Sequence, residues 1–399
     1  MEIEEAVALL EKNILPVSDA QECPLCESFS RVLSDNIYAQ INVPPFAKSA
    51  MDGYAVRAAD LTGASKEAPV SLQVTGQLFA GDWKNIPYRK NTAIRVMTGS
   101  PVPQGFDAVV MQEDTDYGED KVLVYKAVLP GKNYCAAGED IKKGGLILER
   151  GRKIGRGEIG LLASLGFSSV KVRRSARVAL LNTGSELLMP GQPLSEGRIY
   201  SSIGPMLSAS IKNAGLEIST EKIIKDDEKE ITTAIKKALK TSDLLITTGG
   251  VSVGKKDLLP AVLKTLGAKT LFTGVNIKPG TPTTASLLDG KVILSLSGNP
   301  YAALVNFDIY FYYAAASLMQ CNSLRPVRKE ALLADSYEKT NSLRRFVRAR
   351  LDCGKVYLPS QNHASSVISN LTDCNCYLDL PAGASLKAGE KVQVWMMGE

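Results

Sequence analysis

Strands and helices alternate over residues 176–325, and this alternation constrains the fold more than any other feature of the chain. The apolar runs of strand length are ARVALLN, LEISTEKII, DLLITT and KVILSLS, and helices are expected over 202–214, from about Asp227, near 257–266 and, as a long helix, from Pro300. This pattern predicts a doubly wound parallel sheet with helices on both faces. Ligands of such sheets bind at the carboxyl ends of the strands.

Three loops rich in glycine or serine follow strands of this predicted sheet and should converge on one edge of it. They are TGSE at 183–186, TTGGVSVGKKD at 247–257 and SGNP at 297–300. Glycines let the backbone approach a ligand closely, and unpaired N–H groups at a helix start favour an anion. The spacing in TTGGVSVGKKD is neither a P-loop nor a dinucleotide fingerprint, so it implies neither ATP nor NAD. An ordinary strand-to-helix turn is the alternative for this loop taken alone.

The flanking regions predict three further structural parts. MEIEEAVALLEKN indicates a folded amphipathic helix, and residues 16–43 indicate a second helical stretch and a turn. Short strands separated by Gly and Pro turns over 68–128 predict a small β domain, and those over 326–399 predict a small barrel. The predicted domains are an N-terminal domain from 1–50 and 135–175, an inserted β-rich domain at 51–134, an α/β domain at 176–325 and a C-terminal β-barrel domain at 326–399.

Composition excludes several classes of function. The 399 residues include one histidine, His363, and carry a net charge of +5 from 47 basic and 42 acidic side chains. A single histidine argues against His-based triads and His-ligated metals, so the chemistry should depend on carboxylates, lysines, hydroxyls and backbone amides. The basic runs lack aromatic platforms, so no nucleic-acid partner is expected. No apolar run is long enough to span a bilayer, so we expect a cytoplasmic protein without a membrane partner.

Seven cysteines leave two interpretations open. Cys23 and Cys26 form a CxxC, and Cys374 and Cys376 form a CxC, so four thiolates could in principle bind zinc. The pairs are far apart in sequence and neither has the glycine context of a zinc knuckle. Reduced, unrelated thiols are therefore the favoured interpretation.

Carboxylates and one lysine at loops are the candidate functional side chains. The loop acids are Asp52, Asp140, Glu186, Asp226, Asp227 and Asp257. Such carboxylates can hold Mg²⁺ or orient a hydrated ligand, whereas an N-cap role is the alternative, in particular for Asp227 and Asp257. Lys278 in IKPGTP either contacts an oxyanion or is a solvated lysine before a turn. SGNP offers backbone donors and the amide of Asn299 at a helix start, where Pro300 suits the first helical position.

Together these segments resemble the MoeA-type molybdopterin molybdenumtransferases, a family that includes the E domain of gephyrin and the plant enzyme. The matching blocks, in family order, are PPFAKSAMDGYAVRAAD, IRVMTGSPVPQGFDAVVMQED, GEDIKKG, NTGSEL, PGQPLSEGRIYSS, TTGGVSVGKKD, IKPGTP and SGNPYAALVNF. The resemblance runs from about residue 2 to the C-terminus. It implies a homodimer of multi-domain α/β subunits, each with an elongated N-terminal α+β domain, an inserted β domain, an α/β domain and a C-terminal β-barrel.

The same resemblance implies an activity. Family members insert molybdate, or tungstate, into adenylylated molybdopterin and release AMP, which is the last step of molybdenum cofactor biosynthesis. Molybdopterin-AMP and molybdate are then the substrates, and Mg²⁺ is the cofactor, held by Glu186 and Asp257. Implied partners are a molybdopterin adenylyltransferase and the apoenzymes that accept the cofactor. A non-catalytic molybdopterin-binding scaffold and a molybdopterin adenylyltransferase are the two alternatives.

Site residues are carried over motif by motif. The implied catalytic set is Asp52, Thr98, Asp140, Glu186, Asp227 and Asp257. The implied cofactor and oxyanion region is Thr183, Gly184, Gly249, Gly250, Ser252, Gly254, Lys278, Pro279, Gly280, Ser297, Gly298, Asn299, Pro300, Arg348 and Ser365. The chain departs from the family pattern at Ala47, Lys48, Gly274, Thr281 and Ser297. Because Gly274 and Thr281 stand where lysines are usual, the sequence predicts weakened oxyanion binding.

Overall fold

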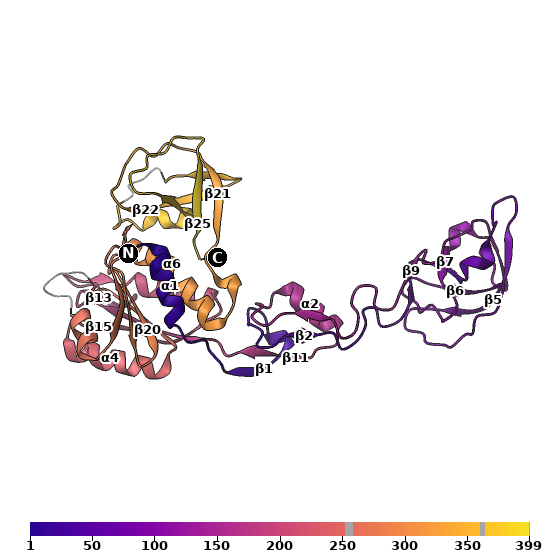
Figure 1. Ribbon diagram of the computed structural model, residues 1–399, viewed down its shortest axis with the longest axis horizontal. Coiled ribbons are helices and arrows are strands. Elements are labelled where there is room, and N and C mark those ends of the chain that lie inside the picture. Colours follow the sequence, from indigo (N-terminus) through magenta and orange to yellow (C-terminus); the bar gives the residue numbers. More distant parts are fainter. Residues whose placement is uncertain (252–257, 360–363, 399) are drawn as a thin grey trace. The chain divides into compact units, whose positions relative to one another are not determined.

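The computed structural model describes residues 1–251, 258–359 and 364–398, which divide into two compact units (Figure 1). Unit 1 comprises Met1–Ser34, Gly151–Gly155 and Val170–Glu399, and unit 2 comprises Asp35–Arg150 and Arg156–Ser169. The four predicted domains do not coincide with these two units, because the predicted N-terminal domain has residues in both, and the predicted boundaries stay predictions.

Unit 1 contains a six-stranded sheet in the order β15-β12-β16-β20-β19-β17. Its strands are β12 (Arg177–Thr183), β15 (Glu217–Ile224), β16 (Leu244–Thr248), β17 (Lys269–Thr273), β19 (Thr284–Leu288) and β20 (Lys291–Leu296). The four strands β15, β12, β16 and β20 run parallel, which confirms the predicted parallel arrangement. The sheet is nevertheless mixed, because β19 pairs antiparallel with both β20 and β17.

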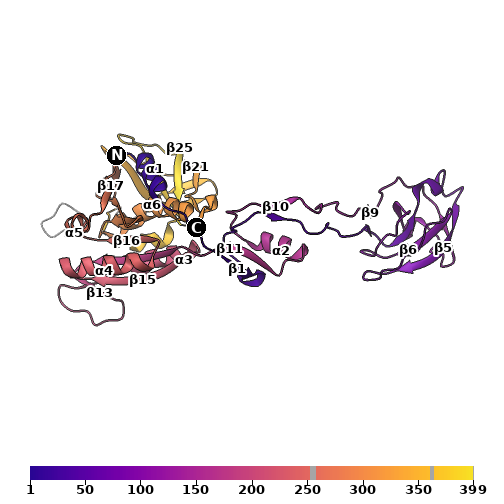
Figure 2. The ribbon, with the colours of Figure 1, turned by 60° about the horizontal axis from the view of Figure 1, so that its bottom comes forward.

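Alternate residues along the strands pack into two separate cores, one on each face of the sheet. Val178 and Leu180 of β12 belong to the larger core, with three helices, whereas Ala179 and Leu181 belong to the other, with two helices. The helices of the larger core are α1 (Ile3–Asn13), α3 (Ile203–Asn213) and α6 (Pro300–Met319), and those of the other are α4 (Glu228–Thr241) and α5 (Leu259–Thr265). A period of two is expected for strands buried on both faces. The predicted helices of this region are confirmed, and Figure 2 shows α4 beside β15.

Helix α6 is buried on every side. Of its 20 residues 17 are buried, and its apolar composition all round is that of a helix with no solvent face. Helix α1 contacts α6, with its apolar residues Ile3, Ala6, Val7 and Leu10 buried as predicted (Figure 1). The same core includes Phe346, Tyr377 and Trp395, so α6 packs against both the sheet and the C-terminal strands.

The prediction of a second helix within 16–43 is wrong. This segment forms β1 (Ala20–Pro24), a short 3₁₀ turn and β2 (Ile37–Tyr38). Strand β1 pairs with β11 (Ser169–Arg173), and the guanidinium of Arg173 donates to the Val17 carbonyl at 2.8 Å. Pairing with a segment about 150 residues away therefore overrides the local helical pattern.

The C-terminal part of unit 1 is the predicted barrel. Its strands are β21 (Arg328–Leu333), β22 (Arg344–Asp352), β23 (Lys355–Tyr357), β24 (Cys376–Leu380) and β25 (Lys391–Met396). The order β22-β23-β21-β25-β24 closes because β24 pairs back with β22. The short strand β18 (Ile277–Lys278) joins β22 in parallel, so a segment between α5 and α6 lies against the barrel.

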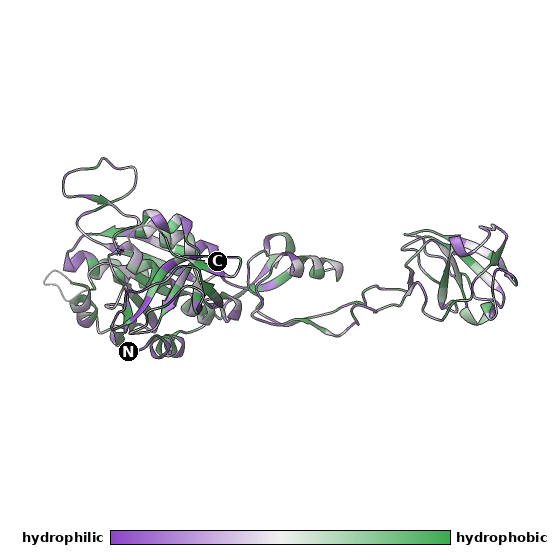
Figure 3. Cartoon of the chain, turned by 90° about the horizontal axis from the view of Figure 1, so that it is seen from above, coloured by the Kyte–Doolittle hydropathy of each residue, from purple (hydrophilic) through white to green (hydrophobic). Residues whose placement is uncertain are grey.

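Unit 2 contains a five-stranded sheet in the order β7-β4-β6-β5-β8. The strands are β4 (Gly53–Val56), β5 (Val70–Leu78), β6 (Thr92–Val96), β7 (Ala108–Met111) and β8 (Lys121–Val124). Two small ladders, β2 with β10 (Leu146–Leu148) and β3 (Lys48–Ser49) with β9 (Tyr134–Cys135), and the helix α2 (Arg156–Ser164) complete the unit. Figure 3 shows apolar stretches, in green, along strands of both units.

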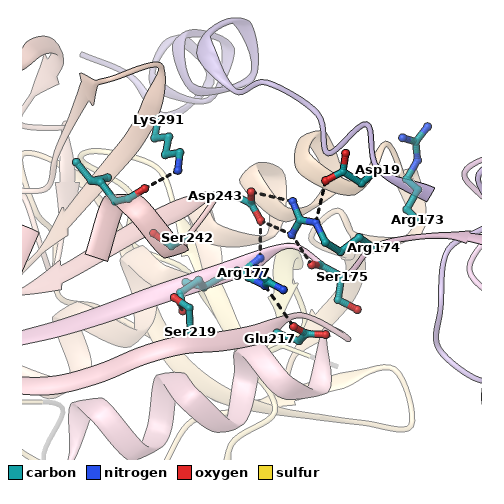
Figure 4. Close-up of polar contacts among 12 residues, drawn as sticks. Asp19, Arg173, Arg174, Ser175, Arg177, Glu217, Ser219, Ser242, Asp243 and Lys291 are labelled. Atoms are coloured by element: carbon teal, nitrogen blue, oxygen red, sulfur yellow. Dashed lines mark hydrogen bonds and ion pairs between the residues drawn. The ribbon is translucent and has the colours of Figure 1, made fainter. Parts of the chain in front are cut away.

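A polar cluster joins the amino ends of β12 and β16 (Figure 4). Asp243 accepts two hydrogen bonds from the guanidinium of Arg174, at 2.9 and 3.1 Å, and one from the backbone N–H of Arg177 at 2.7 Å. Arg174 also contacts Asp19 at 3.3 Å. Burial alone would raise the pKa of Asp243, but the bonds from Arg174 and Arg177 outweigh it, so the pKa lies below its ordinary value.

We expect Asp243→Asn to lower the free energy of unfolding at pH 7 by about 1–3 kcal/mol, because an amide cannot replace the charge-assisted bonds. A lowered carboxyl pKa stabilises the fold above the unfolded-state value near 3.9, and this contribution is lost as the pH falls through the folded-state pKa. The difference between variant and wild type in urea unfolding should therefore shrink below about pH 4.

Glu217→Gln is the matched control for this variant. Glu217 forms an exposed ion pair with Arg177 at 3.7 Å in the same neighbourhood (Figure 4). Its loss should change the free energy of unfolding by less than about 0.5 kcal/mol. Equal losses in the two variants would contradict a special role for Asp243.

A second acid, Asp308 of α6, is buried in the core. The Tyr377 hydroxyl donates to its Oδ2 at 2.6 Å, and its Oδ1 has no hydrogen-bond partner among the described residues. Burial raises the pKa of Asp308 to about 7, and the bond from Tyr377 opposes this only in part. Because the folded state binds this proton more tightly than the unfolded chain, stability contributed here falls as the pH rises from about 4 to about 7.

We expect Asp308→Asn, which removes the charge and keeps the shape, to raise the free energy of unfolding at pH 8 by roughly 2 kcal/mol. At pH 4, where the wild-type carboxyl is protonated in the folded protein, variant and wild type should agree. Chemical denaturation at the two pH values provides the measurement. A variant less stable than wild type at pH 8 would refute the prediction that the buried Asp308 carboxylate destabilises the fold at that pH.

Candidate functional site

The ends of β12, β16 and β20 meet closely, which confirms that the three predicted loops converge. The hydroxyl of Thr183 donates to the Thr248 carbonyl at 3.1 Å. Gly249 has φ +82°, and a Cβ added there would lie 2.4 Å from the Thr183 carbonyl oxygen. A Cβ on Gly298 would lie 3.3 Å from the Gly249 Cα. Glycine is needed at 249 both for the left-handed backbone and for the contact between strand ends.

A cavity of about 470 Å³, called here the sheet-edge cavity, opens over these strand ends. Residues predicted for the site that line it are Thr183, Gly184, Glu186, Gly249, Gly250, Ser297, Gly298 and Pro300. Asn182 and Thr248 also line it and were not predicted; the Thr248 hydroxyl donates to the Asn182 Oδ1 at 2.7 Å. Both are polar residues at or next to the last position of a buried strand: Asn182 opens the block NTGSEL and Thr248 lies within TTGGVSVGKKD, but neither was singled out as a site residue.

Residues of β13 (Leu187–Leu188) and β14 (Ile199–Tyr200) border the same cavity, and the segment 189–198 joins these two strands. Figure 2 shows it as a loop that stands out from the sheet near β13. The exposed Tyr200 hydroxyl donates to the Gln192 carbonyl at 2.8 Å, which ties the loop together. Tyr200, Ser201 and Ser202 line the cavity, and their only sequence signal is the family block PGQPLSEGRIYSS.

Two carboxylates border the sheet-edge cavity. Glu186 is exposed, and its carboxylate folds back over Gly184, since a Cβ added to that glycine would lie 2.8 Å from Glu186 Oε1. Asp226 Oδ2 accepts a hydrogen bond from the Ser185 backbone at 2.9 Å, and the Asp226 N–H donates to the Ser185 hydroxyl at 3.1 Å. These bonds fix Asp226, a loop acid outside the predicted catalytic set, at the cavity.

Asp227, which was placed in the predicted catalytic set, is the N-cap of α4. Its Oδ1 accepts from the backbone N–H groups of Lys229 and Glu230 at 3.0 and 2.9 Å. This is the alternative role that the sequence offered for it. Asp227 lines neither the sheet-edge cavity nor the second cavity described below.

A second cavity, of about 1130 Å³, adjoins the first and shares Pro282 and Ser297 with it. It lies between the α/β loops and the barrel and is called here the barrel cavity. Residues predicted for the site that line it are Lys278, Pro279, Gly280, Ser297, Asn299, Arg348 and Ser365. Asn299 connects the two sides, because its Oδ1 caps α6 and its Nδ2 donates to the Ser365 hydroxyl at 3.3 Å.

The IKPGTP turn has a fixed geometry at this cavity. Gly280 has φ +92°, and a Cβ there would collide with the Asn306 amide, which donates to the Ala302 carbonyl at 2.8 Å. The hydroxyl of Thr281 donates to the Ile277 carbonyl at 2.7 Å. Gly274 has φ +75°, a backbone conformation that disfavours a lysine there.

Three predicted site residues belong to unit 2. Asp52 Oδ1 accepts from both the backbone N–H and the hydroxyl of Thr98, each at 2.7 Å. These two bonds lower the pKa of Asp52, so it is a carboxylate at neutral pH. Asp140 is exposed, and its backbone N–H donates to the Val43 carbonyl at 3.0 Å. The other three predicted residues, Ser252, Gly254 and Asp257, lie outside the described residues, as does His363.

The described part of the chain was also inspected for metal centres and membrane segments. Within it, no group of three or more His, Cys, Asp or Glu side chains is placed to hold a metal ion. The seven cysteines are free thiols. No helix within the described ranges is long and apolar enough to cross a bilayer.

Three family models match almost the whole chain in order. The MoeA N-terminal region (domains I and II) matches residues 1–166, a probable molybdopterin binding domain matches 179–316, and the MoeA C-terminal region (domain IV) matches 330–397. A solved structure, the molybdopterin biosynthesis MoeA protein of Pyrococcus horikoshii OT3, superimposes with a TM-score of 0.87 at 29% identity over 99% of each chain.

Curated relatives agree with these matches. The chain is 36% identical over 396 residues to the molybdopterin molybdenumtransferase of Staphylococcus epidermidis, which covers 98% of this chain and 94% of that protein. It is 36% identical over 372 residues to the enzyme of the same name from Staphylococcus aureus, which covers 92% and 89%. The chain therefore belongs to the MoeA family of molybdopterin molybdenumtransferases.

Proposed function

We propose that this chain inserts molybdate into adenylylated molybdopterin and releases AMP. The observation that carries the proposal is the pair of adjoining cavities, one over glycine-rich strand ends and one facing the barrel, which share Pro282 and Ser297. A substrate with a phosphate-bearing part and a separate acceptor for an oxyanion suits such a pair. Molybdate and tungstate have nearly the same size and charge, so either oxyanion fits the proposal.

The chain's own groups bind and orient the substrates. The positive end of the α6 dipole stabilises phosphate charge, and Asn299 fixes that helix start beside Ser365. Lys278 attracts the oxyanion at the barrel cavity. The lowered pKa of Asp52 keeps this group ionised, so it accepts hydrogen bonds or holds a cation rather than donating a proton.

Carboxylates at the sheet-edge cavity suit magnesium. Glu186 and Asp257 would hold it, and the exposed position of Glu186 at the cavity leaves room for waters and substrate phosphate oxygens, which Mg²⁺ prefers as ligands. When bound, the ion would neutralise charge on the adenylate phosphate.

A direct assay tests the proposal. Purified protein is mixed with adenylylated molybdopterin, molybdate and Mg²⁺, and AMP is followed by chromatography while active cofactor is followed by reconstitution of an apoenzyme. We expect molybdate-dependent release of AMP in step with cofactor formation. Binding without AMP release would support a scaffold instead, and net formation of adenylylated molybdopterin from ATP would support an adenylyltransferase.

We expect Glu186→Gln to reduce the rate of AMP release by roughly 100-fold and to raise the Mg²⁺ concentration needed for half-maximal rate, because a carboxylate contributes several kcal/mol through the metal. Glu196→Gln is the control, since Glu196 is exposed on the loop before β14 and does not line the cavity. Comparable rates for wild type and Glu186→Gln would exclude Glu186 from the reaction.

We further propose a homodimer in which each active site combines Asp52 of one subunit with Glu186 of the other; the support is the family membership and the placement of these residues in different units. Asp52→Ala and Glu186→Gln should each retain no more than roughly one hundredth of wild-type activity alone. After dissociation and mixing in equal amounts, about a quarter of wild-type activity should return, because half of the dimers then hold one intact site of two. A mixture as inactive as its components, with subunit exchange verified by mass, would rule out shared sites.

A further inference from the structure

Asp308 is the one acidic residue in the buried class among the described residues. It lies in the middle of α6, and its Oδ2 shares a hydrogen bond of 2.6 Å with the hydroxyl of Tyr377 in β24. Its other oxygen, Oδ1, is buried and has no hydrogen-bond partner within the described ranges. This hydrogen bond therefore connects the central helix of unit 1 directly to the C-terminal barrel.

The geometry around Asp308 suits a neutral carboxyl group. A carboxylate at this place would be a buried charge stabilised by one hydrogen bond, which is strongly unfavourable. A neutral acid leaves only one uncharged polar atom without a partner, and that loss is smaller. Burial accordingly raises the pKa of Asp308 to about 7, which the bond from Tyr377 lowers only in part. Ionisation near neutral pH thus puts an unpaired charge between α6 and β24.

The elements nearest to Asp308 offer no positive charge to compensate for it. The titratable groups that face it are hydroxyls, Tyr312 one turn further along α6 and Tyr377 from β24. Helix α3 packs neutral side chains against α6, because its one charged residue, Lys212, is exposed.

Charged side chains on the other elements that pack against α6 are exposed or have partners of their own. Glu5 and Lys12 of α1 are exposed. The remaining ones are paired as Glu4 with Arg344, Glu11 with Arg325, Arg344 with Asp379, Arg328 with the Tyr313 hydroxyl, Lys291 with the Leu239 carbonyl, and Arg348 with the Asn370 side chain and the Ala364 carbonyl. None of these cations forms an ion pair with Asp308.

Tyr377 connects this buried acid to the wall of the barrel cavity. Its ring centre lies 6.4 Å from that of Tyr301, and in the antiparallel register it is the partner of Arg348. Tyr301 and Arg348 both line the barrel cavity, and the Arg348 guanidinium carbon lies 3.7 Å from the Tyr301 ring centre. A shift of β24 away from α6 therefore moves two residues of the cavity wall.

We propose that Asp308 and Tyr377 form a pH-sensitive contact that holds the barrel against α6 while Asp308 is neutral and loosens the barrel wall of the cavity when Asp308 ionises. The contact acts on the wall whichever ligand the cavity holds, so it does not depend on the proposed function.

The sign and size of the effect follow from proton linkage. The folded state binds the Asp308 proton more tightly than an opened state in which water reaches the side chain and its pKa returns to about 3.9. The equilibrium constant for opening should therefore rise about tenfold per pH unit between about pH 4 and pH 7 and level off above. Between pH 5 and pH 8 this amounts to a change of roughly 100-fold.

Hydrogen exchange of the full-length protein, followed by mass spectrometry and corrected for the intrinsic effect of pH, tests the proposal. We expect amides of β24, and those of β22 that pair with it, to lose protection by roughly 100-fold from pH 5 to pH 8 in the wild type. Asp308→Asn, which cannot ionise, should change less than about threefold. Asp373→Asn is the matched control, because Asp373 is exposed just before β24, and it should behave as wild type. Equal pH dependence in wild type and Asp308→Asn, or none in the wild type, would overturn the proposal.

Tyr377→Phe keeps the proposal falsifiable even if Asp308→Asn does not fold. The bond from Tyr377 favours the carboxylate, so its loss should move the midpoint of the protection change to higher pH by roughly half a unit to one unit. A midpoint equal to that of wild type, or a lower one, would contradict a contact through Tyr377.

Fluorescence provides an independent measurement, because the chain has two tryptophans. Trp395 is buried in the core around α6, whereas Trp83 is exposed. In a Trp83→Phe background, acrylamide should quench Trp395 more strongly at pH 8 than at pH 5.5, and adding Asp308→Asn should remove this difference. The same difference in both proteins would assign the pH effect to another group and overturn the proposal.

Discussion

The burial of α6 on all sides is the constraint on which both cavities depend. Its apolar residues are covered by the sheet, by α1 and by Phe346, Tyr377 and Trp395 of the C-terminal strands, so the barrel cannot move away without exposing the helix core. The N-cap of the helix is Asn299, in the SGNP loop, and the Asn299 Oδ1 accepts a hydrogen bond from the Ala302 N–H; Asn299 lines the barrel cavity and Pro300 lines the sheet-edge cavity. One packing arrangement thus fixes both the helix start at the sheet-edge cavity and the opposite wall of the barrel cavity.

Much of this architecture could be predicted because its determinants are local. The alternation of strands and helices predicts the parallel strands and their helices, and the turn-separated strands predict the barrel. The antiparallel strand β19 was missed, although the chain carries the signal: Asp289 and Gly290, both with positive φ, form the two-residue turn of a hairpin between β19 and β20. The helix expected within 16–43 failed for the opposite reason, because the pairing of β1 with β11 is non-local and leaves no trace in the local pattern.

The candidate site likewise has features that local sequence order predicts and features that only tertiary packing decides. Loops that follow strands could be placed at one sheet edge from order alone, and the contacts among Thr183, Gly249 and Gly298 confirm it. Which of two adjacent acids enters the cavity could not be predicted, since Asp226 and Asp227 differ only in whether the side chain bonds to Ser185 or caps α4. That difference depends on the backbone direction at the start of a helix, which is set by tertiary packing. Motif matching assigns a residue type to a position, whereas hydrogen-bond partners decide its role.

Charge at the barrel cavity shows why counting cations along a sequence is insufficient. Gly274 and Thr281 suggested a pocket short of positive charge, and both are engaged in backbone geometry that serves the turn. The number of arginines in β22 would instead suggest a cavity rich in positive charge. Neither count separates Arg344, neutralised by two carboxylates, and Arg348, enclosed by carbonyls and a ring, from Arg345, whose donors remain open. The strand period of two places Arg344 and Arg345 on opposite faces, and the register with β18 then brings Lys278 to the same face as Arg345. The affinity of such a cavity for an anion therefore depends on which cations remain without ion pairs and unburied after folding. The loss of a lysine at Gly274 or Thr281 can be compensated by the placement of another cation, without any change in net charge.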